Sequence, residues 1–420
     1  MKFIIKGKIK LKGEVDVGGM KNAILPILAA TALVKGTSVI SNVPQISDVK
    51  KMLEILGSLG AEIKWLSPHQ LSIKTDDLAL GEMDQKKVKS MRSSVLLMGP
   101  LLARFKEVSI SEPGGCIIGA RPLDTHLYAL RMLGASVNFD NTAQVYSIKA
   151  NELAGNYIIL PEFSVTATEN LIMAAVLAGG RTVVKLAAAE PHVENLIDFL
   201  NKAGAKIQGG GTHTLTIDGV KELKGAEHNV IPDQIEAGTY AAAAVVLRGN
   251  IKINKIIPEH LDSTIILLRK LGVGVEIGSD YLEIRPQGAA LPAFKLQTLP
   301  YPGFPTDLQS PFGVVATQCN GTSLIHDPMY EGRMGYVSEL VRMGANAVLC
   351  DPHRVLITGP TPLYGQEIKS LDLRAGATMV IAAMVAEGES VLHDAEILDR
   401  GYENIEEKLK GLGAEIKRVD

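Results

Sequence analysis

The sequence predicts an α/β protein made of six similar repeats, three in each of two domains. Three observations support this prediction. A helix that ends in glycine and leads into a short strand recurs six times along the chain. A second kind of helix, apolar nearly all round, precedes several of these copies and should therefore be buried. The 420 residues are enough for two domains, each with a core of its own.

The recurring phrase reads LEILGSLGAEI in its first copy and LKGLGAEI in its last. Glycine adopts the left-handed conformation of a helix C-terminus at no steric cost, so each glycine predicts a helix end. Successive copies are separated by 74, 70, 68, 72 and 69 residues, and their glycines are Gly60, Gly134, Gly204, Gly272, Gly344 and Gly413. Such a regular period of about 70 residues indicates a repeated structural unit.

The apolar helices are predicted at stretches such as NAILPILAATAL, TENLIMAAVLAG, YAAAAVVLRG and GATMVIAAMVAEG. Strand-like segments such as TSVISNVP and ESVLHDAEI follow two of them and lead toward the glycine-terminated helix. One repeat is therefore expected to run helix, strand, helix, strand, with further short strands. A single repeat cannot bury both of its faces, so the repeats must pack together.

Composition narrows the classes of function. A formal net charge of −3 argues against a nucleic acid or a membrane surface as partner. The longest apolar run, at 377–386, is far shorter than the roughly 20 residues of a membrane helix. Three widely separated cysteines form neither a disulfide framework nor a metal cluster, and the first residues do not resemble a signal peptide. We expect a cytoplasmic protein without a metal.

Charged residues fall at equivalent places in the repeats. Counting back 14 residues from the residue that closes the apolar helix gives Asn22, Arg92, Thr166, Asp307 and Arg374. Counting back 11 to 13 residues from the recurring glycine gives Asp48, Arg121, His192, His260, Arg333 and Arg400. Asp48 is a simple acidic cap, but arginine is unfavourable at a helix start. We therefore predict an anion site built from Lys21, Arg92, Arg121, Arg333, Arg374 and Arg400.

Two further residues are candidates for chemistry. Asp307 lies in PYPGFPTDLQSPF, just before a helix, and is either a plain helix cap or a general base for a hydroxyl group. Cys116 lies in the glycine-rich stretch EPGGCIIGARP, five residues before Arg121, and is either a chance surface thiol or a reactive one. Cys319 and Cys350 lie in apolar strand-like stretches and are expected in the core.

Over residues 1–420 the chain resembles the enolpyruvyl transferase family, and within it the enzymes that act on UDP-N-acetylglucosamine. The resemblance depends on the order of GGMKNAILPILAA, MRSSVLLMGPLLARF, PGGCIIGARPLDTHLYAL, TATENLIMAA, IPDQIEAGTY, GFPTDLQSPF, YEGRM, DLRAGA and DRGYENIEEKLKGLGA. It implies an α+β prism: two inside-out, barrel-like α/β domains, each of three βαβαββ-type repeats. The implied domains are 22–231, with the Cys116 loop, and 1–21 plus 232–420, with the active site in the cleft between them.

The resemblance also implies an activity. The enolpyruvyl group of phosphoenolpyruvate would be transferred to the 3-hydroxyl of UDP-N-acetylglucosamine through a tetrahedral ketal, with release of phosphate. This is the first committed step of peptidoglycan precursor synthesis and the target of fosfomycin. The implied partners are these two small molecules, with no cofactor. A transferase like 5-enolpyruvylshikimate-3-phosphate synthase, and an idle relative that only binds a UDP-sugar, are the alternatives.

Each matching motif implies roles for particular residues. Cys116, Asp307, Lys21 and Arg400 would be catalytic. Phosphoenolpyruvate would be held at its phosphate by Lys21, Arg121 and Arg400, and at its carboxylate by Arg333 and Arg374. The UDP-sugar would contact Asn22, Arg92, Arg121, Asp124, Ser164, Val165, Thr166, Asp307 and Met329. The chain departs from the family pattern at Glu162, Thr166 and Met334.

Overall fold

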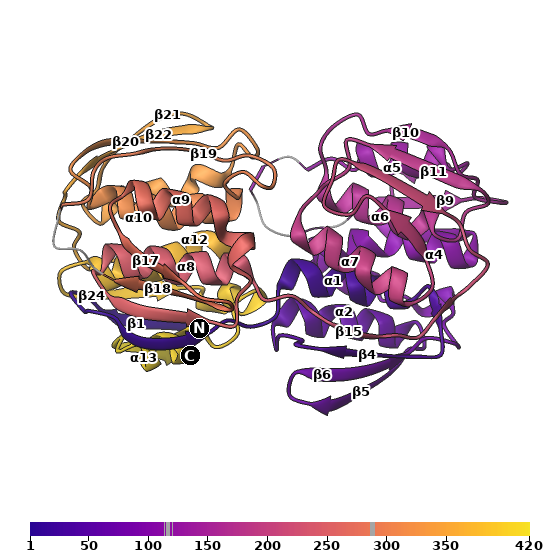
Figure 1. Cartoon of the computed structure of the whole chain (residues 1–420), viewed down its shortest axis with the longest axis horizontal. Helices are drawn as coiled ribbons and strands as arrows, with labels where there is room; N and C mark the ends of the chain where they lie inside the picture. Colours follow the sequence, from indigo (N-terminus) through magenta and orange to yellow (C-terminus); the bar gives the residue numbers. More distant parts are fainter. Residues whose placement is uncertain (113, 115–117, 120, 286–289) are drawn as a thin grey trace. The chain divides into compact units, whose positions relative to one another are not determined.

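The computed structural model describes residues 1–112, 114, 118–119, 121–285 and 290–420 (Figure 1). Cys116 lies outside these residues, so its predicted roles stay predictions. The chain forms two compact units. The N-terminal unit holds the described residues of Gly19–Gly115 and Arg121–Ile231. The C-terminal unit holds the described residues of Met1–Gly18, Cys116–Ala120 and Pro232–Asp420.

The chain passes from one unit to the other after Gly18 and after Ile231, and the described residues 118–119 also belong to the C-terminal unit, within a stretch of the chain that otherwise belongs to the N-terminal unit. Gly18 lies three residues before the predicted end of the first segment at 21. In the C-terminal unit the Asp233 N–H donates to the Gly18 carbonyl at 2.9 Å. In the N-terminal unit the Met20 N–H donates to the Ile231 carbonyl at 2.8 Å. The two passages therefore run next to each other.

Three repeats make up the N-terminal unit. Its buried helices are α1 (Lys21–Thr31), α4 (Met98–Phe105) and α6 (Val165–Ala175). Its second helices are α2 (Ser47–Ser58), α5 (Asp124–Met132) and α7 (Pro191–Lys202). The three main sheets have the strand orders β15-β4-β6-β5, β7-β9-β8 and β10-β11-β13-β12. Short elements complete it: β3 (Val34–Lys35) paired with β14 (Leu223–Lys224), η1 (Leu80–Glu82), α3 (Gln85–Ser90) and η2 (Arg92–Leu97).

The strands of these sheets are short. They are β4 (Thr37–Ser41), β5 (Glu62–Ser67), β6 (Gln70–Lys74) and β15 (Glu227–Asn229) in the first sheet. The second sheet holds β7 (Glu107–Ser111), β8 (Ser136–Asp140) and β9 (Val145–Lys149). The third holds β10 (Tyr157–Ile159), β11 (Arg181–Lys185), β12 (Lys206–Gln208) and β13 (Thr214–Asp218). The closing parallel strand of the first sheet, β15, comes from the end of the unit and pairs with β4 near its start.

The C-terminal unit has the same plan. Its buried helices are α8 (Gln234–Val246), α10 (Gln309–Thr317) and α12 (Leu373–Val385). Its second helices are α9 (Asp262–Lys270), α11 (Tyr336–Arg342) and α13 (Ile405–Gly411). Short 3-10 helices lie at four of the repeat positions singled out in the sequence: η3 (Pro258–Leu261) with His260, η4 (Thr306–Leu308) with Asp307, η5 (Arg333–Gly335) with Arg333 and η6 (Ala395–Arg400) with Arg400. Figure 1 shows α8, α10 and α12 inside this unit with its sheets outside.

Its three sheets take in the first strands of the chain. The sheet β23-β24-β1-β25 contains β1 (Lys2–Lys6), β23 (Glu367–Lys369), β24 (Glu389–His393) and β25 (Ile416–Val419). The sheet β17-β18-β16-β2 contains β2 (Lys12–Asp16), β16 (Asn250–Asn254), β17 (Gly274–Ile277) and β18 (Tyr281–Arg285). The sheet β19-β20-β22-β21 contains β19 (Lys295–Gln297), β20 (Gly321–His326), β21 (Asn346–Asp351) and β22 (Arg354–Gly359). The described strands form separate sheets rather than a closed barrel.

The six predicted helix ends are confirmed. All six recurring glycines have a positive φ, between 74° and 108°. At the first of them the Gly60 N–H bonds to the Gly57 carbonyl and the Ala61 N–H bonds to the Leu56 carbonyl, both at 3.0 Å. This pattern satisfies carbonyl groups that the helix itself leaves unpaired. The repeat therefore has a steric cause, since a side chain at this position would be strained in every copy.

The apolar helices are buried as predicted, and each unit has its own core. Every residue of α8 is buried, and α10 packs against both α8 and α12. Cys319 is buried in the C-terminal core, but Cys350 on β21 is exposed, so the prediction for Cys350 was wrong. Strand residues alternate between faces, and β21 has an outer face as well as an inner one. Among the described helices, none has the length and apolar character needed to span a bilayer.

Candidate active site

The structure places the predicted charged residues at or near the starts of helices in both units. In the C-terminal unit the central member is Arg374, the second residue of α12. Asp372 caps this helix and accepts hydrogen bonds from the backbone N–H of Arg374 at 2.7 Å and of Ala375 at 3.1 Å. The backbone of Arg374 is therefore held in place by hydrogen bonds, and its side chain is only 5% exposed.

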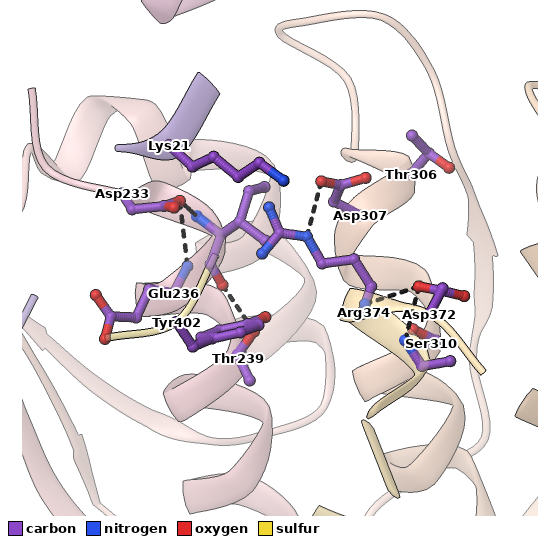
Figure 2. A network of polar contacts seen from close by, with 12 residues as sticks. Lys21, Asp233, Glu236, Thr239, Thr306, Asp307, Ser310, Asp372, Arg374 and Tyr402 are labelled. Carbon is purple, nitrogen blue, oxygen red and sulfur yellow. Dashed lines mark hydrogen bonds and ion pairs between the residues drawn. The ribbon is translucent and has the colours of Figure 1, made fainter. Parts of the chain in front are cut away.

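Asp307 joins Arg374 to a second arginine. Its Oδ2 lies 2.9 Å from Arg374 Nε, and its Oδ1 lies 2.5 Å from Arg333 Nη2. Figure 2 shows the contact with Arg374. Asp307 lies in η4, the turn before α10, and Arg333 begins η5, the turn before α11. We define these three side chains as the arginine–aspartate cluster.

Both arginines of the cluster are positively charged. Burial by itself would lower the pKa of Arg374, but the attraction of Asp307, Tyr402 and Asp233 outweighs it, and the pKa is raised. Burial likewise opposes the charge of Arg333, and Asp307 is the largest of the influences that raise its pKa. The two buried guanidinium groups and the carboxylate that bridges them together carry one net positive charge.

Each guanidinium also has one N–H donor whose hydrogen bond is not satisfied by the described residues. Within the described part of the chain, Arg333 Nε and Arg374 Nη1 are buried and have no hydrogen-bond partner. Buried polar groups are nearly always satisfied in native proteins, so exceptions commonly mark binding positions. Guanidinium groups are well suited to carboxylate and phosphate groups, which accept hydrogen bonds from such donors.

Several residues that sequence reasoning missed hold this cluster in place. Asp327 is fully buried and accepts hydrogen bonds from Thr298, from Thr306 beside Asp307, and from the backbone N–H of Met329. It therefore fixes the turn that carries Asp307 and the predicted contact residue Met329 together. No periodic signal marks Asp327, since it follows a strand as many aspartates do.

The backbone of Arg333 is held in a similar way. Gln309 donates to the Arg333 carbonyl at 3.2 Å, and the Tyr336 hydroxyl donates to Gln309 at 3.0 Å. Gly332, the preceding residue, donates its N–H to the carbonyl of Ile118 at 3.0 Å. Ile118 belongs to the C-terminal unit, whereas the predicted domain 22–231 ran through it without interruption. Met334, a departure from the family pattern, is buried in the core beside Arg333.

A second network lies behind Arg374, at the start of α8. Asp233 caps α8 by accepting from the backbone N–H of Ile235 and Glu236, and its burial raises its pKa. Thr239 and Tyr402 share a hydrogen bond of 2.9 Å, and the Arg374 guanidinium lies over the Tyr402 ring at 5.3 Å (Figure 2). Arg400 ends η6, which packs against α12. Arg400 is thus placed on an element next to the one that carries Arg374.

In the N-terminal unit the structure pairs Lys21 with Asp48. Lys21 is the first residue of α1, and its Nζ lies 2.7 Å from Asp48 Oδ2. The Asp48 side chain is only 2% exposed. Asp48 was predicted to be a helix cap, and this is wrong, because α2 begins after Ile46 without a side-chain cap. Asn22, the next residue of α1, is half-buried.

The residues predicted on the nucleotide side come together around α5 and α6. An Arg92 Nη2 group donates to the Arg121 carbonyl, so these two arginines are neighbours. Asp124 begins α5 and is exposed. Ser164 caps α6, accepting from the Ala167 N–H, and is followed by Val165 and Thr166 in the first turn. The helices α5 and α6 pack against each other.

Two of the departures from the family pattern make hydrogen bonds in this group. Thr166 Oγ1 lies 2.8 Å from His126 Nε2, and Thr125 donates to Glu162 at 2.8 Å. Burial, and to a lesser degree the charge of Arg92, lowers the pKa of His126 to about 3. His126 is therefore neutral, and sequence reasoning missed it, since a lone histidine on the buried face of an amphipathic helix carries no distinct signal.

Comparison with known proteins identifies the family. The family model described as EPSP synthase (3-phosphoshikimate 1-carboxyvinyltransferase) matches residues 5–409. The chain belongs to this family. Relatives named UDP-N-acetylglucosamine 1-carboxyvinyltransferase are 42% identical in Koribacter versatilis, over 100% of this chain and 96% of the relative, and 43% identical in Helicobacter pylori, over 99% and 98%. A relative from Caldanaerobacter subterraneus, named UDP-N-acetylglucosamine 1-carboxyvinyltransferase 1, is 44% identical over 99% of both chains.

Solved structures confirm the fold of this carboxyvinyltransferase family. The enolpyruvyl transferase NikO from Streptomyces tendae matches with a TM-score of 0.89 and 23% identity, covering 100% of this chain and 98% of NikO. EPSP synthase from Acinetobacter baumannii matches with a TM-score of 0.74 and 19% identity, covering 100% of both chains. At these identities the likeness concerns the fold alone. The expected α/β fold of two three-repeat bodies is that of the family.

Proposed function

We propose that this chain transfers the enolpyruvyl group of phosphoenolpyruvate to the 3-hydroxyl of UDP-N-acetylglucosamine and releases phosphate. The observation that carries the proposal is the name shared by relatives 42–44% identical over nearly the whole chain. This reaction would supply the first committed intermediate of peptidoglycan. It implies the cytoplasm, where both substrates are made.

The arginine–aspartate cluster supports one half of this assignment. Phosphoenolpyruvate carries a carboxylate and a phosphate, and the buried guanidinium groups of Arg333 and Arg374 suit the carboxylate. Lys21, Arg121 and Arg400 would hold the phosphate and stabilise it as it leaves. Cations placed where negative charge develops commonly account for the largest part of such catalysis.

The chemistry is an addition followed by an elimination. An acid protonates C3 of phosphoenolpyruvate, and the oxygen of the sugar hydroxyl adds to C2 as Asp307 takes the hydroxyl proton. The resulting ketal loses a proton from C3 together with phosphate, which restores the double bond as an enol ether. Cys116 is our proposed acid, on the resemblance alone. Asn22, Arg92, Asp124, Ser164, Val165, Thr166 and Met329 would position the UDP-sugar.

The test is phosphate release from phosphoenolpyruvate, with UDP-N-acetylglucosamine or shikimate 3-phosphate as acceptor, before and after treatment with fosfomycin. We expect release that requires the UDP-sugar and stops after fosfomycin. Release with shikimate 3-phosphate alone would assign the chain to the other branch of the family. An absence of release with either acceptor, while UDP-N-acetylglucosamine still binds, would identify an idle relative.

A matched pair of variants connects the activity with the site. Arg374→Gln removes a buried guanidinium of the cluster and should lower kcat/KM by at least about hundredfold, or about 2.7 kcal/mol of transition-state stabilisation. Arg354→Gln removes an exposed guanidinium from the same unit, where it pairs with Asp351 on β21. This control should change kcat/KM less than about twofold. Equal losses in both variants would contradict the role of Arg374.

A further inference from the structure

The arginine–aspartate cluster contains a contact that the proposed chemistry does not require. A general base needs to reach the acceptor hydroxyl, yet both carboxylate oxygens of Asp307 are bound by guanidinium groups, at 2.5 Å and 2.9 Å. These are the same two groups, on Arg333 and Arg374, that we assign to the carboxylate of phosphoenolpyruvate. One internal carboxylate and one substrate carboxylate therefore depend on the same pair of cations.

Because the cluster is buried, its two arginines require a carboxylate as counter-ion. The side chains of Arg333, Arg374 and Asp307 are 10%, 5% and 18% exposed. A buried guanidinium without a counter-ion is strongly unfavourable. Asp372 and Asp233 also attract the arginines, but they accept hydrogen bonds from backbone N–H groups at the starts of α12 and α8. Asp307 is thus the carboxylate that neutralises both arginines directly.

The geometry of the contact leaves room for an exchange. Asp307 accepts one hydrogen bond from Arg333 Nη2 and one from Arg374 Nε. Arg333 Nε and Arg374 Nη1 have no partner within the described residues. Because both donors are buried, a second carboxylate takes them only as Asp307 leaves the arginines. The two arginines have a carboxylate as counter-ion both before and after the exchange.

We propose that Asp307 competes with the substrate's carboxylate for Arg333 and Arg374, so that binding of phosphoenolpyruvate releases Asp307 to act as the base. A carboxylate held between two guanidinium groups is a weak proton acceptor, and it gains basicity on release. The released carboxylate takes the hydroxyl proton as the new C–O bond forms at C2. Once protonated it no longer attracts the arginines, which stay with the substrate. The inference depends on the proposed function for the identity of this substrate.

If Asp307 competes with the substrate, removing it should tighten binding of phosphoenolpyruvate, whereas removing an ordinary binding residue weakens binding. An internal competitor weakens apparent affinity in proportion to the time for which it occupies the site. If Asp307 holds the arginines for nine-tenths of the time, removing it should tighten phosphoenolpyruvate binding about tenfold. Turnover should nevertheless be lost, because the base is gone. A residue that only helped to build the site would weaken binding when removed.

The experiment is isothermal titration of the full chain with phosphoenolpyruvate, pyruvate and inorganic phosphate, without any acceptor. Asp307→Asn and Asp307→Ala should bind the two carboxylates about tenfold more tightly and inorganic phosphate within about twofold of the original chain. Asp307→Glu keeps a competing carboxylate and should show no such gain. Circular dichroism before titration identifies any variant that does not fold, and the remaining neutral variant then decides.

Every other result overturns the inference. Unchanged or weaker carboxylate binding in the neutral variants would show that Asp307 does not compete. An equal gain for inorganic phosphate would mean that removing a negative charge favours any anion. Failure of the proposed function is separate, since it would appear as binding of phosphoenolpyruvate without phosphate release for any acceptor. In that case the titrations still decide whether Asp307 competes with a carboxylate.

Discussion

Acid should destabilise the N-terminal unit because His126 is buried in it as a neutral side chain. His126 on α5 is 3% exposed, and burial lowers its pKa from 6.5 to about 3. A pKa that is lower in the folded state means that the unfolded chain binds the proton more strongly. The contribution of neutral His126 to the free energy of unfolding is therefore complete above about pH 6.5 and is lost as the pH falls from about 6.5 toward about 3.

The size of the effect follows from the two pKa values. At about pH 5 the unfolded His126 is nearly all protonated while the folded one is neutral, which removes about 2 kcal/mol of stability relative to about pH 7.5. At about pH 4 the loss grows to about 3 kcal/mol. Losses of this size are a large fraction of the stability of a typical domain.

Trp65 makes the measurement specific to this unit. It is the only tryptophan of the chain, and it lies on β5, in the same unit as His126. Urea unfolding followed by its fluorescence should give the free energy of unfolding of the N-terminal unit at each pH. His126→Gln keeps a side-chain amide within reach of Thr166 and cannot titrate. Its loss of stability from about pH 7.5 to about pH 5 should be smaller by about 2 kcal/mol.

A second variant separates burial from hydrogen bonding. Thr166→Val removes the partner of His126 but keeps the buried imidazole, so it should cost about 1 kcal/mol at every pH and retain the full acid dependence. The reasoning is refuted if His126→Gln and the original chain lose equal stability on acidification. It is also refuted if Thr166→Val abolishes the dependence, because the hydrogen bond rather than burial would then be the cause.

Two further predictions concern buried groups in both units. Asp48→Asn removes the carboxylate of a buried ion pair and should lower the free energy of unfolding in urea by about 3 kcal/mol. It should also raise KM for phosphoenolpyruvate more than it lowers kcat, since Lys21 loses its orientation. An unchanged KM would contradict this prediction. In thiol titration of the folded chain, Cys350→Ser should lose one reactive thiol and Cys319→Ser should lose none. The reason is that Cys350 is exposed, whereas burial raises the pKa of Cys319 to about 12. Reaction of Cys319 before unfolding would contradict this prediction.

Much of the fold could be predicted because its causes are local. A glycine that ends a helix with a positive φ leaves the same mark in all six repeats, and helices buried on every side are apolar on every side. Counting back from the residue that closes each apolar helix also located helix starts, including Asn22 in α1 and Thr166 in α6. The exact form of each start was not predictable, and Asp307 and Arg333 lie in 3-10 turns instead of α-helix.

The partners of the site residues could not be predicted, because they depend on which helix starts meet. Asp48 has the sequence context of a cap, yet α2 has no side-chain cap and the Asp48 carboxylate forms an ion pair with Lys21. Asp307 was expected at a substrate hydroxyl, and the structure gives it two arginines as partners. A period along the chain identifies equivalent positions, but it does not give the distances between the side chains at those positions.

The repeats themselves explain why these partners recur. In the first repeat the start of the buried helix contacts the start of the second helix through Lys21 and Asp48. In the fifth repeat the same contact is made with the charges exchanged, by Asp307 and Arg333. In the second, a guanidinium meets a backbone carbonyl, between Arg92 and Arg121. In these three repeats the starts of the two helices thus meet through a different combination of groups each time, so the position of the contact is common to them while its charge is not.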